Sequence, residues 1–347
     1  MIKISSIYRL APLFLFLTYS YVFSSATVLR GAGATFPYPL YKKWFLKYSE
    51  NSDARIIYEP AGSGTGIKKL LSKSVDFGAT DAFLSNSELS AAGSEIIHIP
   101  TCIGAVAIIY NLSEARNLCF SPETIAGIFS GTIKKWDHKE IRKENPNATL
   151  PSEQIKVIHR SEGSGTTFIF TDYLSKVSKN WKKSTGRGKR VRWQTGMGVE
   201  GNEGMAEFIS RVSGSIGYAQ HSFAANRGLP AAAIKNRSGK FITPNLKSLS
   251  LAADLAVPDD SRIMITDTPS ENGYPISAFT YIIVQKKQDY AAGRKKQARS
   301  LFSFLDWCLT EGQKYTSGMG YAPLPSSVVI KAKKNLRNII FDRRPLN

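Results

Sequence analysis

The stretch Lys156-Val-Ile-His-Arg-Ser-Glu-Gly-Ser-Gly-Thr-Thr-Phe168 begins as a strand-like run and continues as a loop rich in glycine and hydroxyl residues. It predicts a strand at 156–159 and a helix at 168–177, with the loop between them. Glycine lets the backbone turn sharply and approach a ligand closely. The first N–H groups of a helix lack intrahelical partners and carry partial positive charge. A loop of this kind can therefore hold an anion.

Two further segments share this order of strand, small hydroxyl-bearing loop and helix. They are Gly33-Ala-Thr-Phe36 and Gly62-Ser-Gly-Thr-Gly66. One such loop is a weak indication, since Gly-Ser pairs also make ordinary helix caps, but three in one chain indicate a shared anion site. A nucleotide-binding P-loop is excluded because no loop ends in Gly-Lys-Ser/Thr. The Gly-x-Ser-x-Gly elbow of serine hydrolases is absent around Ser63 and Ser164.

Two charged residues complete this set. Arg160 directly follows the 156–159 strand and can bind a tetrahedral oxyanion through two parallel hydrogen bonds. The alternative interpretation is an ordinary surface arginine at the end of a strand. Asp81 follows a strand predicted at 75–79 and, taken alone, would be a turn or capping residue. An ionised aspartate only accepts hydrogen bonds. Hydrogen phosphate can donate a hydrogen bond to it, whereas sulfate would meet an unpaired, repelling carboxylate.

Strand-like and helix-like segments alternate along the rest of the chain. Strands are predicted at 27–30, 55–58, 103–110, 215–219 and 275–285, and helices at 39–48, 67–73, 122–130, 205–212 and 294–308. This alternation predicts an α/β fold.

The first 26 residues have the features of a secretory signal peptide. Lys3 and Arg9 precede an apolar run at 11–23, and small residues follow up to a cleavage point near Ala26. Removing the two basic residues lowers the net charge of the 347-residue chain from +19 to +17. This charge favours anionic partners, but the basic residues are dispersed and no nucleic-acid-binding motif accompanies them.

The cysteines leave two interpretations open. Cys102, Cys119 and Cys308 are an odd number, so one thiol stays unpaired in an exported protein, and Cys102–Cys119 is the closer pair. All three can equally be small buried hydrophobic residues. Since no His or Cys cluster has metal-ligand spacing, we expect neither a metal nor a cofactor.

Longer motifs give the chain a resemblance to a known family. They lie at 31–37, 75–82, 130–137, 160–168, 201–206, 214–219 and 321–329. Over essentially the whole mature chain, the sequence resembles the periplasmic phosphate-binding subunits of bacterial high-affinity phosphate ABC transporters, which are type II periplasmic binding proteins. The resemblance implies two lobes, each a mixed β-sheet flanked by helices, with the ligand in the cleft between them. It also implies non-enzymatic binding of hydrogen phosphate or dihydrogen phosphate and delivery to a permease and ATPase complex in the inner membrane.

The resemblance also assigns roles to individual residues. The implied phosphate contacts are Thr35, Phe36 (through its N–H), Ser63, Asp81, Arg160, Ser164, Gly165 (through its N–H) and Thr166. Asp81 would accept the proton of the phosphate. Glu162 stands where the family often has aspartate and would orient Arg160 without touching the ligand. The loop at 62–66 departs from the family's Gly-Ser-Ser-Gly-Gly pattern but keeps Ser63.

We expect a periplasmic monomer, with lobe 1 formed by 27–107 plus 278–347 and lobe 2 formed by 108–277. No catalytic residue is predicted. Two other functions remain open: a secreted phosphatase on the same scaffold, for which Ser164 is the candidate nucleophile, and a surface adhesin that binds anionic polymers. The basic tract at 185–192 has no role in any of these interpretations.

Overall fold

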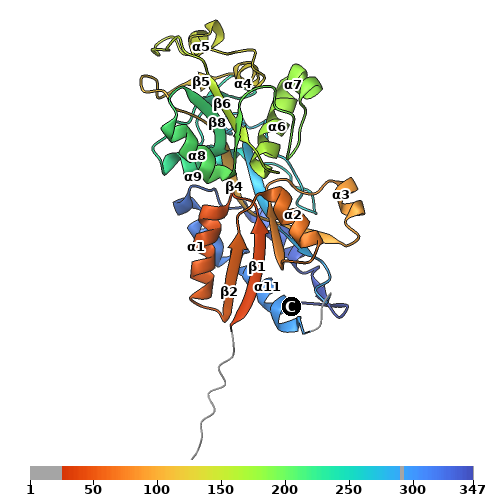
Figure 1. Ribbon diagram of the computed structural model, residues 1–347. Helices are drawn as coiled ribbons and strands as arrows, with labels where there is room; N and C mark the ends of the chain where they lie inside the picture. The colour runs from red at the N-terminus through yellow and green to blue at the C-terminus, as the bar shows by residue number, and fades with distance from the viewer. Residues whose placement is uncertain (1–25, 290–292, 347) are drawn as a thin grey trace, which may run out of the picture.

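The computed structural model describes residues 26–289 and 293–346, so the predicted signal peptide lies outside the described residues except for Ala26. The chain forms two α/β lobes stacked end to end, with α1, β1 and β2 in one lobe and α6 and α8 in the other (Figure 1). Within the described ranges, no helix has the length and apolar character needed to cross a membrane.

Lobe 1 is built on a mixed sheet. Strands β1 (Thr27–Gly33), β2 (Ala54–Glu59) and β3 (Phe77–Thr80) are parallel, and β11 (Ser277–Gln285) runs antiparallel to β3. Its helices are α1 (Tyr38–Ser49), α2 (Ser63–Leu71), α3 (Asn86–Ala91), α11 (Lys295–Leu309) and α12 (Ser326–Leu336), with short 3₁₀ turns at Glu311–Tyr315 and Ser317–Met319 and a hairpin of β12 (Ile340–Phe341) and β13 (Arg344–Pro345). Buried aromatic side chains from α1, β3 and α11, including Trp44, Phe77 and Phe304, form the core of this lobe.

Lobe 2 contains β6 (Lys156–Arg160), β7 (Met197–Val199) and β8 (Ser215–Gln220), which are parallel to one another. A second small sheet consists of β5 (Cys119–Phe120), β9 (Ala233–Lys235) and β10 (Phe241–Ile242). The helices are α4 (Pro122–Phe129), α5 (Lys139–Glu144), α6 (Gly165–Val177), α7 (Lys179–Ser184), α8 (Gly201–Arg211), α9 (His221–Ala225) and α10 (Leu246–Ala252).

One long strand, β4 (Ile96–Tyr110), belongs to both lobes. It pairs with β11 as far as Ala105 and with β8 from Val106 onward. The hydrogen-bonded ladder therefore runs without a break in the order β2-β1-β3-β11-β4-β8-β6-β7. The sequence predicted this strand only from 103, whereas the structure begins it at Ile96 and carries it through Pro100, a residue that cannot donate to a ladder. In the structure the register of the β4–β11 pair shifts beside this proline, and the irregularity accommodates it.

Three helices begin earlier than the sequence predicted. Helix α2 begins at Ser63 rather than 67, α6 at Gly165 rather than 168, and α8 at Gly201 rather than 205. The residues predicted as loops are thus the first helical turns, where small and hydroxyl residues leave N–H groups accessible.

Cys102, Cys119 and Cys308 are free thiols, so the Cys102–Cys119 disulfide is not formed.

Candidate functional site

Four helix N-termini converge where the two lobes meet. Helix α1 follows Thr35 and Phe36, α2 begins at Ser63, and α6 begins after its cap Ser164. The fourth is α8, whose second residue, Asn202, reaches Thr35. All four helices have nine or more residues. Because each N-terminus carries partial positive charge, their convergence creates an environment that favours an anion.

Asp81 is a carboxyl group buried among hydroxyl donors. Its side chain is 1% exposed. Thr280 Oγ1 on β11 donates to Oδ1 at 2.7 Å, and Ser63 Oγ lies 3.4 Å from Oδ2. Burial raises the pKa of Asp81 to about 7, while the Thr280 hydroxyl, the Arg160 charge and the Ser63 hydroxyl act in the opposite direction. The carboxyl group is therefore placed to hold or share a proton near neutral pH.

Arg160 presents its guanidinium from the end of β6. It is 4% exposed, and its Nη1 and Nη2 atoms lie 3.3 Å from Thr166 Oγ1 and Thr35 Oγ1 respectively. Nη2 also forms an ion pair with Glu162. The backbone N–H of Arg160 donates to the Tyr218 hydroxyl at 3.1 Å, which anchors the end of the strand. The guanidinium plane is thus held between a threonine of lobe 1 and a threonine of lobe 2.

The first turn of α6 packs directly against lobe 1. A Cβ atom added to Gly165 would lie 2.3 Å from Ser63 Oγ and 2.4 Å from Asp81 Oδ2. The Gly64 N–H donates to the Gly163 carbonyl across the lobes at 2.9 Å. These approaches require glycine and show that the cleft is closed in this structure.

The remaining predicted residues lie in the same region. Ser164 Oγ caps α6 by accepting from the Thr167 N–H at 3.0 Å, so its hydroxyl proton points elsewhere. The Phe36 carbonyl accepts from the Tyr321 hydroxyl at 2.6 Å, which holds the backbone of the 33–36 turn. The structure therefore brings together all eight predicted contact residues, with Glu162 beside Arg160.

Sequence reasoning missed two residues of this site, Asn202 and Thr280. Asn202 is fully buried and contacts both Thr35 and Thr166. The sequence predicted this helix only from 205, so Asn202 was placed in the preceding loop and nothing showed that it faces the cleft. Thr280 lies in the middle of a strand, and its contact with Asp81 depends on pairing between segments 199 positions apart.

The basic tract at 185–192 lies along the rim of this site. The Lys189 carbonyl accepts from the Ser164 N–H at 2.9 Å. The Lys189 ammonium forms a 2.6 Å ion pair with Glu88 on α3 of the opposite lobe. Arg187 pairs with Asp172 at 2.8 Å, and Arg190 Nη1 donates to the Ser161 carbonyl. The tract thus packs against the start of α6, to which it is hydrogen-bonded, and contributes one ion pair across the cleft.

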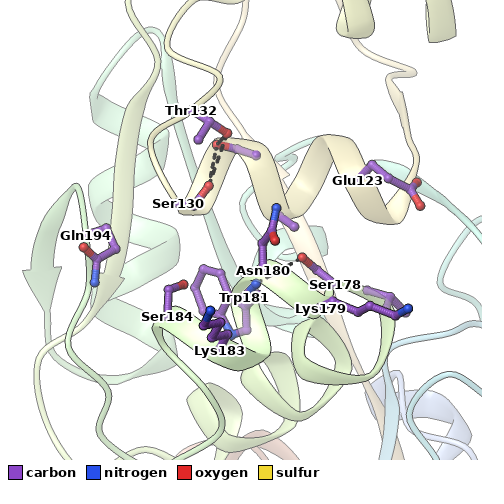
Figure 2. Close-up of a pocket in the computed structure, with 13 residues that line it drawn as sticks. Glu123, Ser130, Thr132, Ser178, Lys179, Asn180, Trp181, Lys183, Ser184 and Gln194 are labelled. Atoms are coloured by element: carbon purple, nitrogen blue, oxygen red, sulfur yellow. Dashed lines mark hydrogen bonds between the residues drawn. The ribbon is translucent and has the colours of Figure 1, made fainter.

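Two arrangements that a hydrolase could use are a metal cluster and an activated serine. Within 26–289 and 293–346, no cluster of three His, Cys, Asp or Glu side chains could hold a metal ion. In the same ranges, no hydrogen bond joins the Ser164 hydroxyl to a His, Asp or Glu side chain. A hollow of about 840 Å³ lies elsewhere in lobe 2, between α4 and α7, and contains none of the predicted site residues (Figure 2).

The fold and site define a class: a two-lobed binding protein with an anion site in a closed cleft. Residues 23–311 match the family model described as the PBP superfamily domain. The phosphate-binding protein PstS of Pasteurella multocida is 37% identical over 313 residues, covering 89% of each chain. The protein of the same name from Methanocaldococcus jannaschii is 36% identical, covering 91% of this chain and 87% of its own. The chain therefore belongs to the PBP superfamily and, within it, to the family of these phosphate-binding proteins.

Solved structures share the fold. A high-affinity periplasmic phosphate-binding protein (PfluDING), solved with phosphate bound, has a TM-score of 0.70 and 22% identity, covering 92% of this chain and 100% of that one. A phosphate-binding protein from Stenotrophomonas maltophilia has a TM-score of 0.65 and 18% identity, covering 89% and 94% of the two chains.

Proposed function

We propose that this protein binds inorganic phosphate in its interlobe cleft and delivers it to an ABC permease for import. The observation that carries the proposal is the position of Asp81, a buried carboxyl group beside the first residues of α2 and α6 and close enough to Arg160 to feel its charge. A site with many donors and one carboxyl acceptor matches an anion that carries a proton. Phosphate near neutral pH carries one or two protons, and sulfate carries none.

The predicted contacts divide between the lobes. Thr35, the Phe36 N–H, Ser63 and Asp81 bind from lobe 1, and the residues of β6 and the first turn of α6 bind from lobe 2. Lobe 1 comprises 27–107 plus 278–347, so the hinge lies in β4 and β11, and the change of partner along β4 at Ala105/Val106 supports this placement. Closure around the anion removes water, which strengthens each hydrogen bond to it.

The protein acts without catalysis and without a cofactor, as a monomer in the periplasm. The curated relatives are named as phosphate-binding proteins, which supports a binding role. The predicted signal peptide supports export, and the transporter's permease and ATPase complex in the inner membrane is the partner that the family implies. Ser164, the candidate nucleophile of the phosphatase alternative, caps α6, and in this proposal its hydroxyl group donates to the anion.

Calorimetric titration of the mature protein, stripped of bound phosphate, tests the proposal. We expect wild type to bind phosphate tightly, with one-to-one stoichiometry, and to bind sulfate negligibly. In Asp81→Asn the amide can donate, so phosphate affinity falls and sulfate affinity rises. Asp254→Asn, at an exposed position, serves as the matched control and leaves both affinities unchanged. If folded wild type binds no phosphate, or hydrolyses phosphate esters, the proposal is wrong.

A further inference from the structure

Asn202 bridges the two lobes at the centre of the site. It is the second residue of α8 and is fully buried. Its Nδ2 atom donates to Thr35 Oγ1 of lobe 1 at 2.8 Å and to Thr166 Oγ1 of lobe 2 at 3.1 Å. Its backbone N–H also lies 3.3 Å from Thr35 Oγ1. One carboxamide thus touches both threonines whose hydroxyl groups are predicted to face the ligand.

The orientation of this carboxamide is set by the backbone. Asn202 Oδ1 accepts the Gln220 N–H, at the end of β8, at 2.9 Å. A backbone N–H can only donate, so the amide cannot turn over without placing its NH₂ group against that donor. Oδ1 lies 3.5 Å from Thr166 Oγ1, farther than Nδ2 does. Asn202 therefore acts toward the two threonines as a donor.

These contacts determine whether the hydroxyl groups of Thr35 and Thr166 donate or accept hydrogen bonds toward a ligand in the cleft. A hydroxyl group has one proton and two lone pairs. Three donors approach Thr35 Oγ1: Asn202 Nδ2 at 2.8 Å, with the Asn202 backbone N–H and Arg160 Nη2 each at 3.3 Å. Thr166 Oγ1 accepts from Asn202 Nδ2 and from Arg160 Nη1. Since donors occupy the lone pairs of both oxygens, the Thr35 hydroxyl retains its proton for an acceptor in the cleft. The Thr166 hydroxyl proton has one protein acceptor, Asn202 Oδ1 at a long 3.5 Å, so a ligand oxygen at ordinary hydrogen-bond distance is the better acceptor for it.

We propose that Asn202 is a positioning residue for phosphate binding, which makes Thr35 and Thr166 obligate hydrogen-bond donors and couples them across the two lobes. The inference rests on the proposed function and deepens it. Because both threonines are committed as donors, Asp81 becomes the acceptor for the phosphate proton. Selectivity for a protonated tetrahedral anion then depends on Asn202 as well as on Asp81.

A double-mutant cycle tests this role. Asn202→Ala weakens phosphate binding by at least about tenfold in the native background, because the two hydroxyl groups are no longer oriented. In a Thr35→Val/Thr166→Val background, where no hydroxyl group remains to be oriented, the same substitution weakens binding by less than about threefold. Equal losses in the two backgrounds would overturn the inference, as would an unchanged affinity in Asn202→Ala.

Two further variants separate positioning from folding. Asn111 Nδ2 donates to the Ile209 and Ser210 carbonyls at the other end of α8, so Asn111→Ala lowers the unfolding temperature and leaves phosphate affinity unchanged. If Asn202→Ala fails to fold, Asn202→Asp repeats the cycle, because its carboxylate still accepts the Gln220 N–H but cannot donate to the threonines. Phosphate binding by wild type combined with an additive cycle would refute this inference alone, whereas no binding by wild type would refute the proposed function.

Discussion

At the scale of single residues, the site depends on a carboxyl group placed where ionisation is costly. Asp81 is surrounded by Ser63, Thr280 and the packed first turn of α6, and burial raises its pKa to about 7. Hydrogen bonds from the Thr280 and Ser63 hydroxyl groups lower the pKa of Asp81, but by less than burial raises it. The ligand-free protein therefore holds a group whose protonation differs between the folded and unfolded states across the range from about pH 4 to pH 7.

This difference predicts a pH-dependent stability. In that range the folded state keeps the Asp81 proton and the unfolded state has lost it, so the free energy of unfolding falls as the pH rises. Asp81→Asn removes the effect and stabilises the ligand-free protein at pH 8 relative to wild type, by at most about 4 kcal/mol, with a smaller gain at pH 5. Urea unfolding of stripped wild type and variant at both pH values measures this difference. A gain that is the same at both pH values would mean that Asp81 is ionised throughout.

At the scale of elements, the site is an arrangement of helix N-termini. The first turns of α2 and α6 face each other across the cleft, and Gly62, with φ of +86°, provides the turn that starts α2. Gly163 and Gly165 lie against Gly64 and Asp81. The absence of side chains at these positions lets the two helix ends approach one anion together.

Gly165→Ala tests this packing. The new methyl group would overlap Ser63 Oγ and Asp81 Oδ2, so the lobes cannot close and phosphate affinity falls by more than about a hundredfold. The lobes still fold, because the clash exists only in the closed form. Gly204→Ala in α8 is the matched control: nothing lies within 4 Å of its added Cβ, so binding is unchanged and stability rises by up to about 1 kcal/mol. Calorimetry and thermal unfolding report both quantities, and normal phosphate binding by Gly165→Ala would contradict the closed-cleft geometry.

At the scale of the whole molecule, closure is supported by contacts at the rim as well as in the site. The Gly64–Gly163 backbone hydrogen bond and the Lys189–Glu88 ion pair join the lobes directly. Lys189 also accepts from the Ser164 N–H through its carbonyl, so the rim contact is tied to the start of α6. The basic tract that had no role in the sequence interpretation thus contributes to the closed form.

Glu88→Gln should weaken phosphate binding by about two- to fivefold at low ionic strength, since it removes a partly exposed ion pair formed on closure. Glutamine keeps the capping contact of this residue with Ser85, so α3 is retained. The effect disappears in about 0.5 M salt, where exposed charges are screened. Glu50→Gln, which removes the Lys47–Glu50 pair at the C-terminal end of α1, is the control and leaves phosphate affinity unchanged at both salt concentrations. A salt-independent loss in Glu88→Gln would exclude the ion pair as its cause.

Much of the site is encoded in local patterns. Small hydroxyl residues after strands mark helix starts because they cap the helix and leave its N–H groups accessible. This reasoning located Thr35, Ser63 and Ser164, and the strand endings located Asp81 and Arg160. The alternation of strands and helices predicted the α/β class. These signals are local because each depends on the conformation of a few consecutive residues.

Contacts between distant segments were decided only by the tertiary structure. The sequence did not predict the first half of β4, and pairing with β11 shows that the strand continues through Pro100. Thr280 reaches Asp81, and Asn202 reaches Thr35, only because strand register and lobe closure bring them together. The sequence by itself determined which residues could donate to an anion. The fold decided how their protons are directed, because a hydrogen bond's direction depends on partners that no local pattern specifies.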